Sequence, residues 1–272
     1  MTDLKTMQAD KRTQAGEARG GARRIDDIVL RARDISHGYD GEEILTEVSL
    51  ELRRGELVTV LGLSGSGKTT LFNILAGLTV PDRGTVSAES KIGYLMQKDL
   101  LLPWKRLIDN ISLPLRLSGV PRREARERAA KFLPRFGLRG LERRWPSQLS
   151  GGQRQRAAIL RTRMYGGEIM LLDEPFAGLD ALTREEIYLW LTDLRREYNL
   201  TILLITHDIE EALSLSDRVL VLAAGHPTTL HPALEIQAPV SSRDMAEKRQ
   251  ALRRMLFTDR EGRLFAAYRR DR

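Results

Sequence analysis

The residues with the clearest chemical meaning form a glycine-rich segment, Gly62-Leu-Ser-Gly-Ser-Gly-Lys-Thr69. It satisfies the pattern G-x-x-x-x-G-K-[ST] and lies between an apolar run and a helix expected at about residues 68–76, the context in which this pattern binds phosphate. Glycines let the backbone wind so tightly that consecutive N–H groups point inward, and the positive end of the following helix points to the same place. The segment therefore predicts a cradle for a phosphate chain.

The cradle assigns a role to individual side chains. Lys68 can reach the β- and γ-phosphates of a nucleotide, and the hydroxyl of Thr69 can ligate Mg²⁺. The structural alternative is a glycine- and serine-rich turn between a strand and a helix. The residues expected to contact the phosphates are Gly62, Ser64, Gly65, Ser66, Gly67, Lys68, Thr69 and Thr70.

Two adjacent carboxylates end the apolar run Ile169-Met-Leu-Leu-Asp-Glu174. Ligands of open α/β sheets lie beyond the carboxyl ends of the strands, so we expect this pair beside the phosphates. Asp173 would hold Mg²⁺ through its water shell, and Glu174 would polarise the attacking water. Taken alone, the pair fits a loop with helix-capping acids; combined with the cradle, it predicts hydrolysis of a nucleoside triphosphate.

The apolar pattern predicts the elements that must position these residues. Four short, continuously apolar runs are typical of parallel strands covered on both faces, and they lie at residues 57–61, 169–172, 202–205 and 219–222. A helix is expected between Thr183 and Asn199, with Thr183 and Glu186 as its capping box. Strands alternating with helices predict an α/β domain with right-handed crossovers.

Other stretches set the expected limits of the domain. Alternating apolar residues predict two half-buried strands, at 28–32 and 48–52, around a turn at 38–41. The expected organisation is a polar, flexible leader at 1–24, an α/β domain at 25–225 with an arginine-rich helical insertion at about 99–160, and a tail at 226–272 with a helix at 245–257. The arginines of the insertion alternate with glutamates, which is typical of a solvated helical face.

Composition excludes several classes of protein. The 272 residues are 42% apolar and 30% charged, a water-soluble globular balance, and the absence of cysteine excludes disulfides and thiolate metal sites. No apolar run reaches the roughly 18 residues of a membrane helix, and the first residues lack a secretory signal, so we expect neither a membrane span nor export. The net charge of +7 is compatible with a nucleic acid, an anionic lipid or a phosphate ligand as a partner.

A third motif connects these observations to a family. Leu149-Ser-Gly-Gly-Gln153 resembles the signature of ATP-binding-cassette (ABC) ATPases, and it precedes the second carboxylate strand as in that family. Ser150 would cap a helix whose backbone amides, with Gly151 and Gly152, form a second anion-binding end. The resemblance covers about residues 28–225. It implies an α/β fold: a P-loop NTPase core with a mostly parallel sheet, an N-terminal antiparallel β subdomain and a helical insertion subdomain.

The resemblance also implies roles for single residues. Tyr39 resembles the aromatic residue that stacks on adenine, Gln97 the glutamine that senses Mg²⁺ and the γ-phosphate, Asp180 the aspartate that meets the opposite subunit, and His207 the histidine that holds the γ-phosphate. The alternatives are a turn tyrosine, a strand-end amide, a helix cap and a buried hydrogen-bonded histidine. The residues expected to take part in catalysis are then Glu174, His207 and Gln97. The metal site would consist of Thr69, Gln97 and Asp173. The nucleotide would be bound by Tyr39, the cradle, Ser150, Gly151, Gly152, Gln153 and Asp180.

The function implied by the family is ATP hydrolysis coupled to transport. Two ATP molecules with Mg²⁺ would lie in a head-to-tail dimer, each held by the cradle of one copy and the signature of the other. Expected partners are a second copy of the chain, integral membrane permease subunits that dock near Gln97, and a separate solute-binding protein, with no nucleic acid. The chain would be peripheral, on the cytoplasmic face of the inner membrane.

Some stretches are similar to the ATPases of nitrate, sulfonate and taurine importers. They are Leu101-Leu-Pro-Trp104, Asp109-Asn110, Pro175-Phe176 and Leu179-Asp-Ala-Leu-Thr-Arg184. The alternative for Trp104 is a core anchor. The chain departs from the usual pattern at 164–167 and 226–239, which weakens the assignment of a solute. Competing functions are an ATPase of an exporter or lipid-transport complex, a soluble cassette ATPase acting on nucleic acid, and a nonhydrolytic regulatory subunit, which is disfavoured because no catalytic position is lost.

Overall fold

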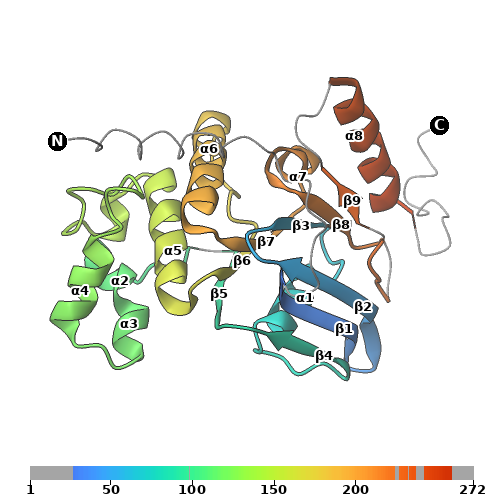
Figure 1. Cartoon of the computed structure of the whole chain (residues 1–272), viewed down its shortest axis with the longest axis horizontal. Coiled ribbons are helices and arrows are strands. Elements are labelled where there is room, and N and C mark those ends of the chain that lie inside the picture. Colours follow the sequence, from blue (N-terminus) through green and yellow to red (C-terminus); the bar gives the residue numbers. More distant parts are fainter. Residues whose placement is uncertain (1–26, 98, 224–226, 232, 237–241, 259–272) are drawn as a thin grey trace, which may run out of the picture.

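The centre of the fold is a six-stranded sheet in the order β5-β6-β7-β3-β8-β9 (Figure 1). Its strands are β3 (Leu57–Leu61), β5 (Ile92–Leu95), β6 (Ile169–Asp173), β7 (Thr201–Thr206), β8 (Arg218–Val221) and β9 (Leu234–Glu235). All pairs are parallel except β8 with β9, which confirms the α/β prediction. The computed structural model describes residues 27–97, 99–223, 227–231, 233–236 and 242–258. The predicted leader, 1–24, lies outside the described residues.

The second sheet is antiparallel and has the order β2-β1-β4. It consists of β1 (Ile28–Tyr39), β2 (Glu42–Arg53) and β4 (Arg83–Ala88). Asp40 and Gly41 connect β1 to β2, both with positive φ (53° and 86°), as tight hairpin turns require. The predicted N-terminal pair of strands around a turn is therefore confirmed.

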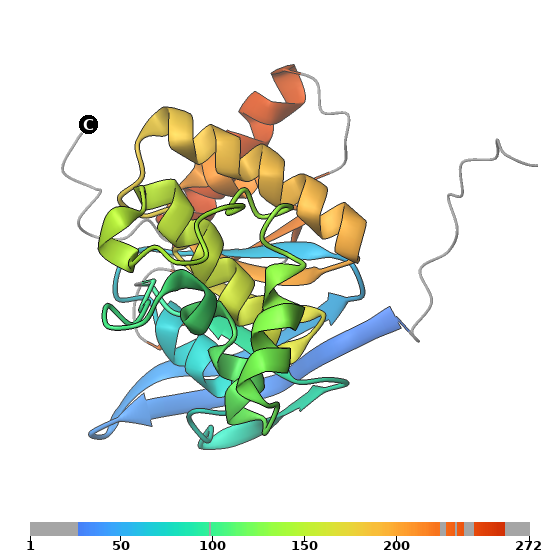
Figure 2. The ribbon, with the colours of Figure 1, turned by 90° about the vertical axis from the view of Figure 1, so that its left-hand side faces the viewer.

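The two faces of the parallel sheet carry different helices. Val58 and Val60 of β3 pack in one cluster with α1 (Lys68–Leu75) and the antiparallel sheet, whereas Leu57 packs in another with α5 (Gly151–Gly166) and α6 (Ala181–Tyr198). Figure 2 shows these layers, with α6 above the sheet and the blue strands β1 and β2 at the bottom. The sheet thus separates α1 from α5.

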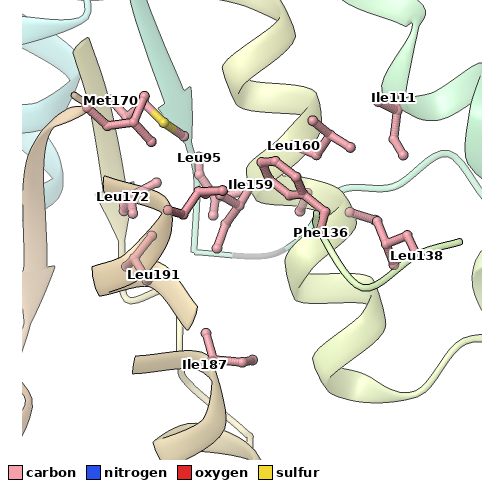
Figure 3. Close-up of a cluster of buried hydrophobic side chains, with 14 of the residues drawn as sticks. Leu95, Ile111, Phe136, Leu138, Ile159, Leu160, Met170, Leu172, Ile187 and Leu191 are labelled. Carbon is pink, nitrogen blue, oxygen red and sulfur yellow. The ribbon is translucent and has the colours of Figure 1, made fainter. Parts of the chain in front are cut away.

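The insertion packs on α5. It contains α2 (Leu107–Ile111), α3 (Leu113–Leu117), α4 (Arg122–Ala130) and a 3₁₀ turn at Pro146–Gln148. Its buried Ile111, Phe136 and Leu138 pack with Ile159 and Leu160 of α5 (Figure 3). The expected end of the insertion, near residue 160, falls inside α5. This one helix packs both on the insertion helices α2 and α3 and on β5, so no boundary divides the two parts at that residue.

The predicted cap of α6 is wrong. The helix begins at Ala181, and the Asp180 carboxylate accepts a hydrogen bond from the backbone N–H of Thr183 at 3.0 Å. The capping residue is therefore Asp180, and Thr183 supplies the N–H that is capped. Asp is as good a capping residue as Thr, and Asp180 stands three residues earlier. The alternative that Trp104 anchors a core is also wrong, because this side chain is 69% exposed.

The described residues beyond 225, at 227–231, 233–236 and 242–258, pack on the rest of the fold. Thr228 exchanges backbone hydrogen bonds with the edge strand β2: its N–H donates to Ile44 at 2.8 Å, and its carbonyl accepts from Thr46 at 2.9 Å. Helix α8 (Ser242–Leu256) lies beside α7 (Ile209–Leu215), where Leu252 and Leu256 are buried. The helix expected at 245–257 is therefore present, and it completes the apolar cover of β8.

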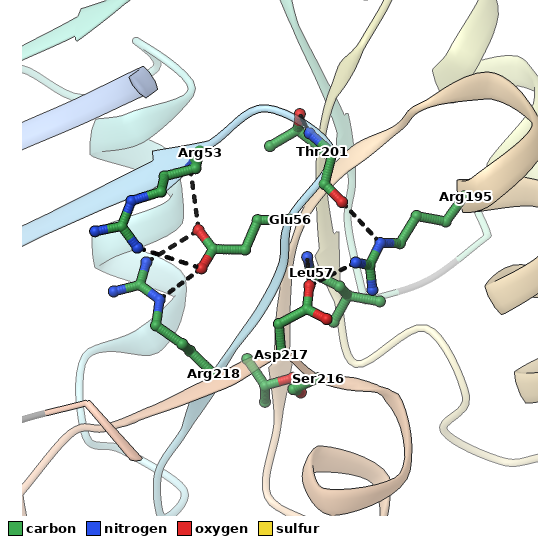
Figure 4. A network of polar contacts seen from close by, with 10 residues as sticks. Arg53, Glu56, Leu57, Arg195, Thr201, Ser216, Asp217 and Arg218 are labelled. Carbon is green, nitrogen blue, oxygen red and sulfur yellow. Dashed lines mark hydrogen bonds and ion pairs between the residues drawn. The ribbon is translucent and has the colours of Figure 1, made fainter. Parts of the chain in front are cut away.

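A polar network holds the amino edge of the parallel sheet (Figure 4). Glu56 is 7% exposed, and its carboxylate accepts from the Nε of Arg218 at 2.7 Å and the Nη2 at 3.1 Å. The same carboxylate accepts from the backbone N–H of Arg53 at 3.0 Å. Arg195 and Asp217 form a second pair at 2.5 Å. These contacts tie the start of β3 to β8, β2 and α6.

We expect Glu56→Ala to lower the free energy of unfolding by about 3 kcal/mol, because removing one partner of a buried pair leaves the other charge uncompensated. Urea denaturation measures this loss. The matched control is Glu124→Ala, which removes an exposed pair with Arg128 within α4 and is expected to cost less than about 0.5 kcal/mol. Equal losses in the two variants would contradict the structural role of Glu56.

Candidate nucleotide-binding site

The predicted cradle lies between β3 and α1. Gly65 and Gly67 have φ values of 82° and 83°, in the left-handed region that favours glycine. A Cβ on Gly67 would lie 2.8 Å from Cδ2 of Leu45, so this position also lacks the space for a side chain. A pocket of about 280 Å³ adjoins the turn and is lined by Tyr39, Ile44, Gly65, Gly67, Lys68, Thr69 and Thr70.

Lys68 is folded back into the loop. Its ammonium group donates to the carbonyl oxygens of Gly62 at 2.9 Å and Leu63 at 2.7 Å. Burial lowers the pKa of Lys68, while the charges of Glu174 and Asp173 act in the opposite direction. A buried cation next to backbone N–H groups is suited to a multiply charged anion, because phosphate oxygens can replace the two carbonyls.

Asp173 lies at the end of β6, next to α1. Its Oδ2 accepts from the Thr69 hydroxyl at 3.4 Å and from the Tyr94 hydroxyl at 3.4 Å. Burial and the neighbouring charge of Glu174 raise the pKa of Asp173, and these two hydrogen bonds only partly oppose the shift. A cation beside Asp173 would oppose this shift, because it stabilises the charged form of the carboxyl group.

Glu174 lies between the two side chains that the resemblance placed at the γ-phosphate. Its Oε2 accepts from the amide of Gln97 at 3.2 Å, and its Oε1 lies 3.1 Å from Nδ1 of His207. The backbone of Glu174 has a φ of 44°, which is strained for a residue with a side chain. Its N–H still donates to the carbonyl of Ile205 on β7 at 3.0 Å. This conformation turns the carboxylate out of the sheet toward Gln97 and His207.

Tyr39 lies at the end of β1, on the wall of the pocket, and is 48% exposed. Its ring meets that of His37 edge to face, with centroids 4.8 Å apart. His37 in turn lies 3.3 Å from the carboxylate of Asp82. An exposed aromatic face beside a phosphate cradle can stack on a base.

The signature residues lie at the start of α5, on the other face of the sheet from α1. Ser150 and Gln153 cap each other: the Ser150 hydroxyl accepts from the Gln153 N–H at 3.2 Å, and the Gln153 side chain accepts from the Ser150 N–H at 3.0 Å. The predicted cap at Ser150 is confirmed. A Cβ on Gly152 would lie 2.9 Å from Cγ2 of Thr183, so close packing of α5 on α6 requires glycine here.

The structure thus brings some predicted residues together and leaves others apart. Lys68, Thr69, Asp173, Glu174, Gln97 and His207 are connected by direct contacts or by shared neighbours. Ser150, Gly151, Gly152 and Gln153 form a separate helix end, and Asp180 caps α6. The alternative of a buried histidine is wrong for His207, whose side chain is 60% exposed.

One residue at this site escaped the sequence analysis. Tyr94 hydrogen bonds to Asp173, and its ring meets that of Phe72 on α1 at 5.8 Å. Burial raises the pKa of the Tyr94 phenol, so it stays a donor to the carboxylate. In the sequence, the one indication of a role for Tyr94 is its position three residues before Gln97. That its strand β5 pairs with β6, and so brings Tyr94 to Asp173, is known only from the sheet topology.

The donors present fit a hard divalent cation. Thr69 and Asp173 offer a hydroxyl and a carboxylate oxygen, the oxygen ligands that Mg²⁺ prefers, and a second carboxylate, that of Glu174, stands next to Asp173 in the chain. Within the described residues, no group of three or more His, Asp or Glu side chains could hold a metal ion. A cation here would therefore need further oxygens, such as those of phosphates.

Comparison with known proteins identifies the family. A family model described as "ABC transporter" matches residues 45–177. The chain is 43% identical over 237 residues to the formylaminopyrimidine import ATP-binding protein ThiZ of Halalkalibacterium halodurans, covering 85% of this chain and 94% of that protein. The chain belongs to the ABC transporter family. The resemblance seen in the signature is therefore confirmed.

Further similarities agree with an ATPase of the import type. This ABC ATPase is 40% identical over 207 residues to the aliphatic sulfonates import ATP-binding protein SsuB of Cupriavidus pinatubonensis, covering 73% of this chain and 67% of that protein. It also matches the dimeric post-hydrolysis structure of the ATP-binding cassette MJ0796 bound to ADP and Pi, with a TM-score of 0.66, 29% identity, and coverage of 77% and 99%. The predicted function, the ATP-hydrolysing subunit of an ABC importer, is thus confirmed.

We expect Lys68→Ala to raise the dissociation constant of this ABC ATPase for ATP by about 10- to 100-fold, because hydrogen bonds to a charged group contribute about 1.5–3 kcal/mol. Isothermal titration calorimetry measures the change. The matched control is Lys91→Ala, an exposed lysine before β5, which should bind ATP as the unaltered chain does. Unchanged affinity in Lys68→Ala would remove Lys68 from the phosphate site.

Proposed function

We propose that two copies of this chain bind two ATP molecules head to tail and use their hydrolysis to drive a membrane permease that imports a small polar solute. The observation that carries this proposal is the position of Glu174, held between Gln97 and His207 beside the phosphate cradle. A carboxylate at this place can orient a water molecule for attack on the terminal phosphoryl group.

The separation of the two anion-binding ends supports the dimer. The helices that follow the two ends, α1 after the cradle and α5 after the signature, pack on opposite faces of one sheet. We therefore infer that a single chain offers each triphosphate one end. A second copy, rotated by two-fold symmetry, supplies its own Ser150, Gly151, Gly152 and Gln153 to the γ-phosphate, while Asp180 meets the opposite subunit. ATP favours the closed dimer because its γ-phosphate contacts both copies, and ADP lacks that group.

Each predicted residue has a task in this dimer. Lys68 and the backbone amides from Gly65 to Thr70 hold the phosphates, with Gly62, Ser64 and Ser66 shaping the loop, and Tyr39 stacks on the adenine. Glu174 accepts a hydrogen bond from the attacking water, and Gln97 and His207 orient the γ-phosphate. Thr69, Asp173 and Gln97 hold Mg²⁺. The bound ion would neutralise charge that develops on the phosphate oxygens.

Exposed apolar side chains around Gln97 support a membrane partner. Met96, Leu100 and Trp104 flank this residue in the chain and are 45%, 49% and 69% exposed. Asn110 fixes the loop that carries Trp104: its side chain donates to the Leu102 carbonyl at 3.1 Å and accepts from the Leu102 N–H at 2.7 Å. An ordered loop with exposed apolar groups is suited to receiving a short helix of a permease subunit.

The sequence motifs favour a solute of the nitrate, sulfonate and taurine group or a related small molecule. The relatives ThiZ and SsuB are named for the import of formylaminopyrimidine and aliphatic sulfonates. In the proposed assembly a separate solute-binding protein delivers the solute, and the chain lies peripherally on the cytoplasmic face of the cell membrane. None of the helices in the described part of the chain combines the length and apolarity needed to cross a membrane.

We expect Glu174→Gln to bind MgATP with near-normal affinity, to hydrolyse it at least about 100-fold more slowly, and to accumulate as a dimer. The amide keeps the shape of the side chain but accepts protons poorly. Phosphate release measures turnover, and sedimentation velocity with MgATP measures the dimer. Near-normal hydrolysis would remove Glu174 from catalysis, and a variant that stays monomeric with MgATP would contradict the head-to-tail dimer.

Copurification of this chain with integral membrane proteins tests its proposed role in transport. We expect the tagged chain, expressed in its source organism, to copurify in detergent with integral membrane subunits, and ATP hydrolysis by that complex to rise with one imported solute. Trp104→Ala should weaken this copurification without altering hydrolysis by the isolated chain. A chain that instead binds nucleic acid in a salt-sensitive manner would contradict the transport function.

A further inference from the structure

A polar cluster connects two loops of the proposed site within one subunit. Helix α6 follows Asp180, and α7 follows His207. The two helices are in contact, and their first turns are joined by the ion pair between Arg184 of α6 and Asp208 at the start of α7. The loop expected to meet the opposite subunit is therefore physically close to the residue that precedes α7.

Arg184 contacts both loops at once. Its Nη2 donates to the carbonyl of Leu179, the residue before Asp180, at 3.2 Å. Its Nη1 lies 3.5 Å from the carboxylate of Asp208, the residue after His207, and its Nε lies 4.0 Å from the carboxylate of Glu211. A planar guanidinium can hold such separate acceptors in a fixed geometry, which a lysine cannot do.

Glu211 holds the other side of His207. Its side chain is 8% exposed, and its Oε2 accepts from the Thr206 hydroxyl at 2.5 Å. The same hydroxyl accepts from the backbone N–H of Asp208 at 3.0 Å. Tyr188 of α6 adds a further hydrogen bond to the Glu211 carboxylate, and burial raises the pKa of that carboxyl group. Both neighbours of His207 are therefore fixed by Glu211 and Arg184.

We propose that Arg184 and Glu211 are positioning residues that couple the loop of Asp180 to the side chain of His207. This inference rests on the proposed function, in which Asp180 meets the second subunit and His207 meets the γ-phosphate. Movement of the Leu179–Asp180 segment when the second subunit docks pulls on the Arg184 guanidinium. The guanidinium in turn shifts Asp208 and Glu211, and so sets the position of His207 against Glu174.

This arrangement explains why a buried carboxylate stands four residues after His207. If position 211 only filled space in the core, an apolar side chain would suffice there. The neighbouring Ala212, Leu213 and Leu215 of the same helix are buried apolar residues of this kind. A buried carboxylate costs free energy unless it is bonded, and here each of its bonds leads to a residue beside His207 or to α6. The coupling gives the second subunit control over the catalytic geometry.

A double-mutant cycle tests the coupling in the full-length chain. We expect Arg184→Ala to lower kcat for ATP hydrolysis on the order of tenfold, with an unchanged dissociation constant for ATP. In a His207→Ala background the same change should have no further effect on kcat, because its route of action is already lost. The matched control is Arg195→Ala, which removes an ion pair of α6 with Asp217. It should lower the melting temperature and leave kcat unchanged.

The outcomes distinguish a failure of the proposed coupling from a failure of the proposed role of His207. If Arg184→Ala lowers kcat by the same factor in both backgrounds, or lowers ATP affinity and melting temperature along with kcat, the coupling is wrong and Arg184 is only structural. If His207→Ala alone leaves hydrolysis unchanged, the proposed role of His207 fails, and the coupling with it. Should Arg184→Ala not fold, Glu211→Gln provides the same cycle with a side chain of nearly the same shape.

Discussion

The parallel register of four strands is the constraint on which the site depends. Within the sheet Leu95 lies opposite Leu172, Asp173 opposite Ile205, and Leu61 opposite Thr206. The next residues of each strand must therefore emerge at one level, on the carboxyl edge. A slip of two residues in any pair would move one functional side chain by about 6–7 Å, beyond hydrogen-bond reach. The positions of Gln97, Glu174 and His207, each within two residues of the end of its strand, therefore follow from strand pairing, whereas Lys68 is placed by the loop between β3 and α1.

That edge carries charge and strain that the rest of the fold must hold in place. Two carboxylates and an ammonium group are partly buried there, and Glu174 has a left-handed backbone. The opposite edge has the reverse character, because Glu56 and Arg218 are paired, bonded and shielded from water. Strain persists only where its surroundings over-determine it. The network at the amino edge fixes β3 and β8 in relation to β2, while the carboxyl edge stays open to a nucleotide.

Much of this site could be predicted from local pattern. The cradle, the carboxylates after β6 and the capped signature helix each depend on residues within about ten positions of one another, so spacing alone carries the information. Sequence reasoning failed where partners are distant or interchangeable. Tyr94 reaches Asp173 from a strand 79 residues away in the chain. Two good capping residues, Asp180 and Thr183, stand close together at the start of α6, and only packing decides which of them caps the helix.

The sequence by itself determined the chemistry: a phosphate cradle, a carboxylate pair and a family signature, because these depend on residue types at short spacing. Tertiary structure decided which of these groups meet. It placed Glu174 between Gln97 and His207, put the signature helix α5 on the other face of the sheet from α1, joined Thr228 to β2 and packed helix α8 on α7. It also enclosed Glu211 between Thr206 and Arg184. Such contacts arise from strand order and helix packing, which no short segment of the chain encodes.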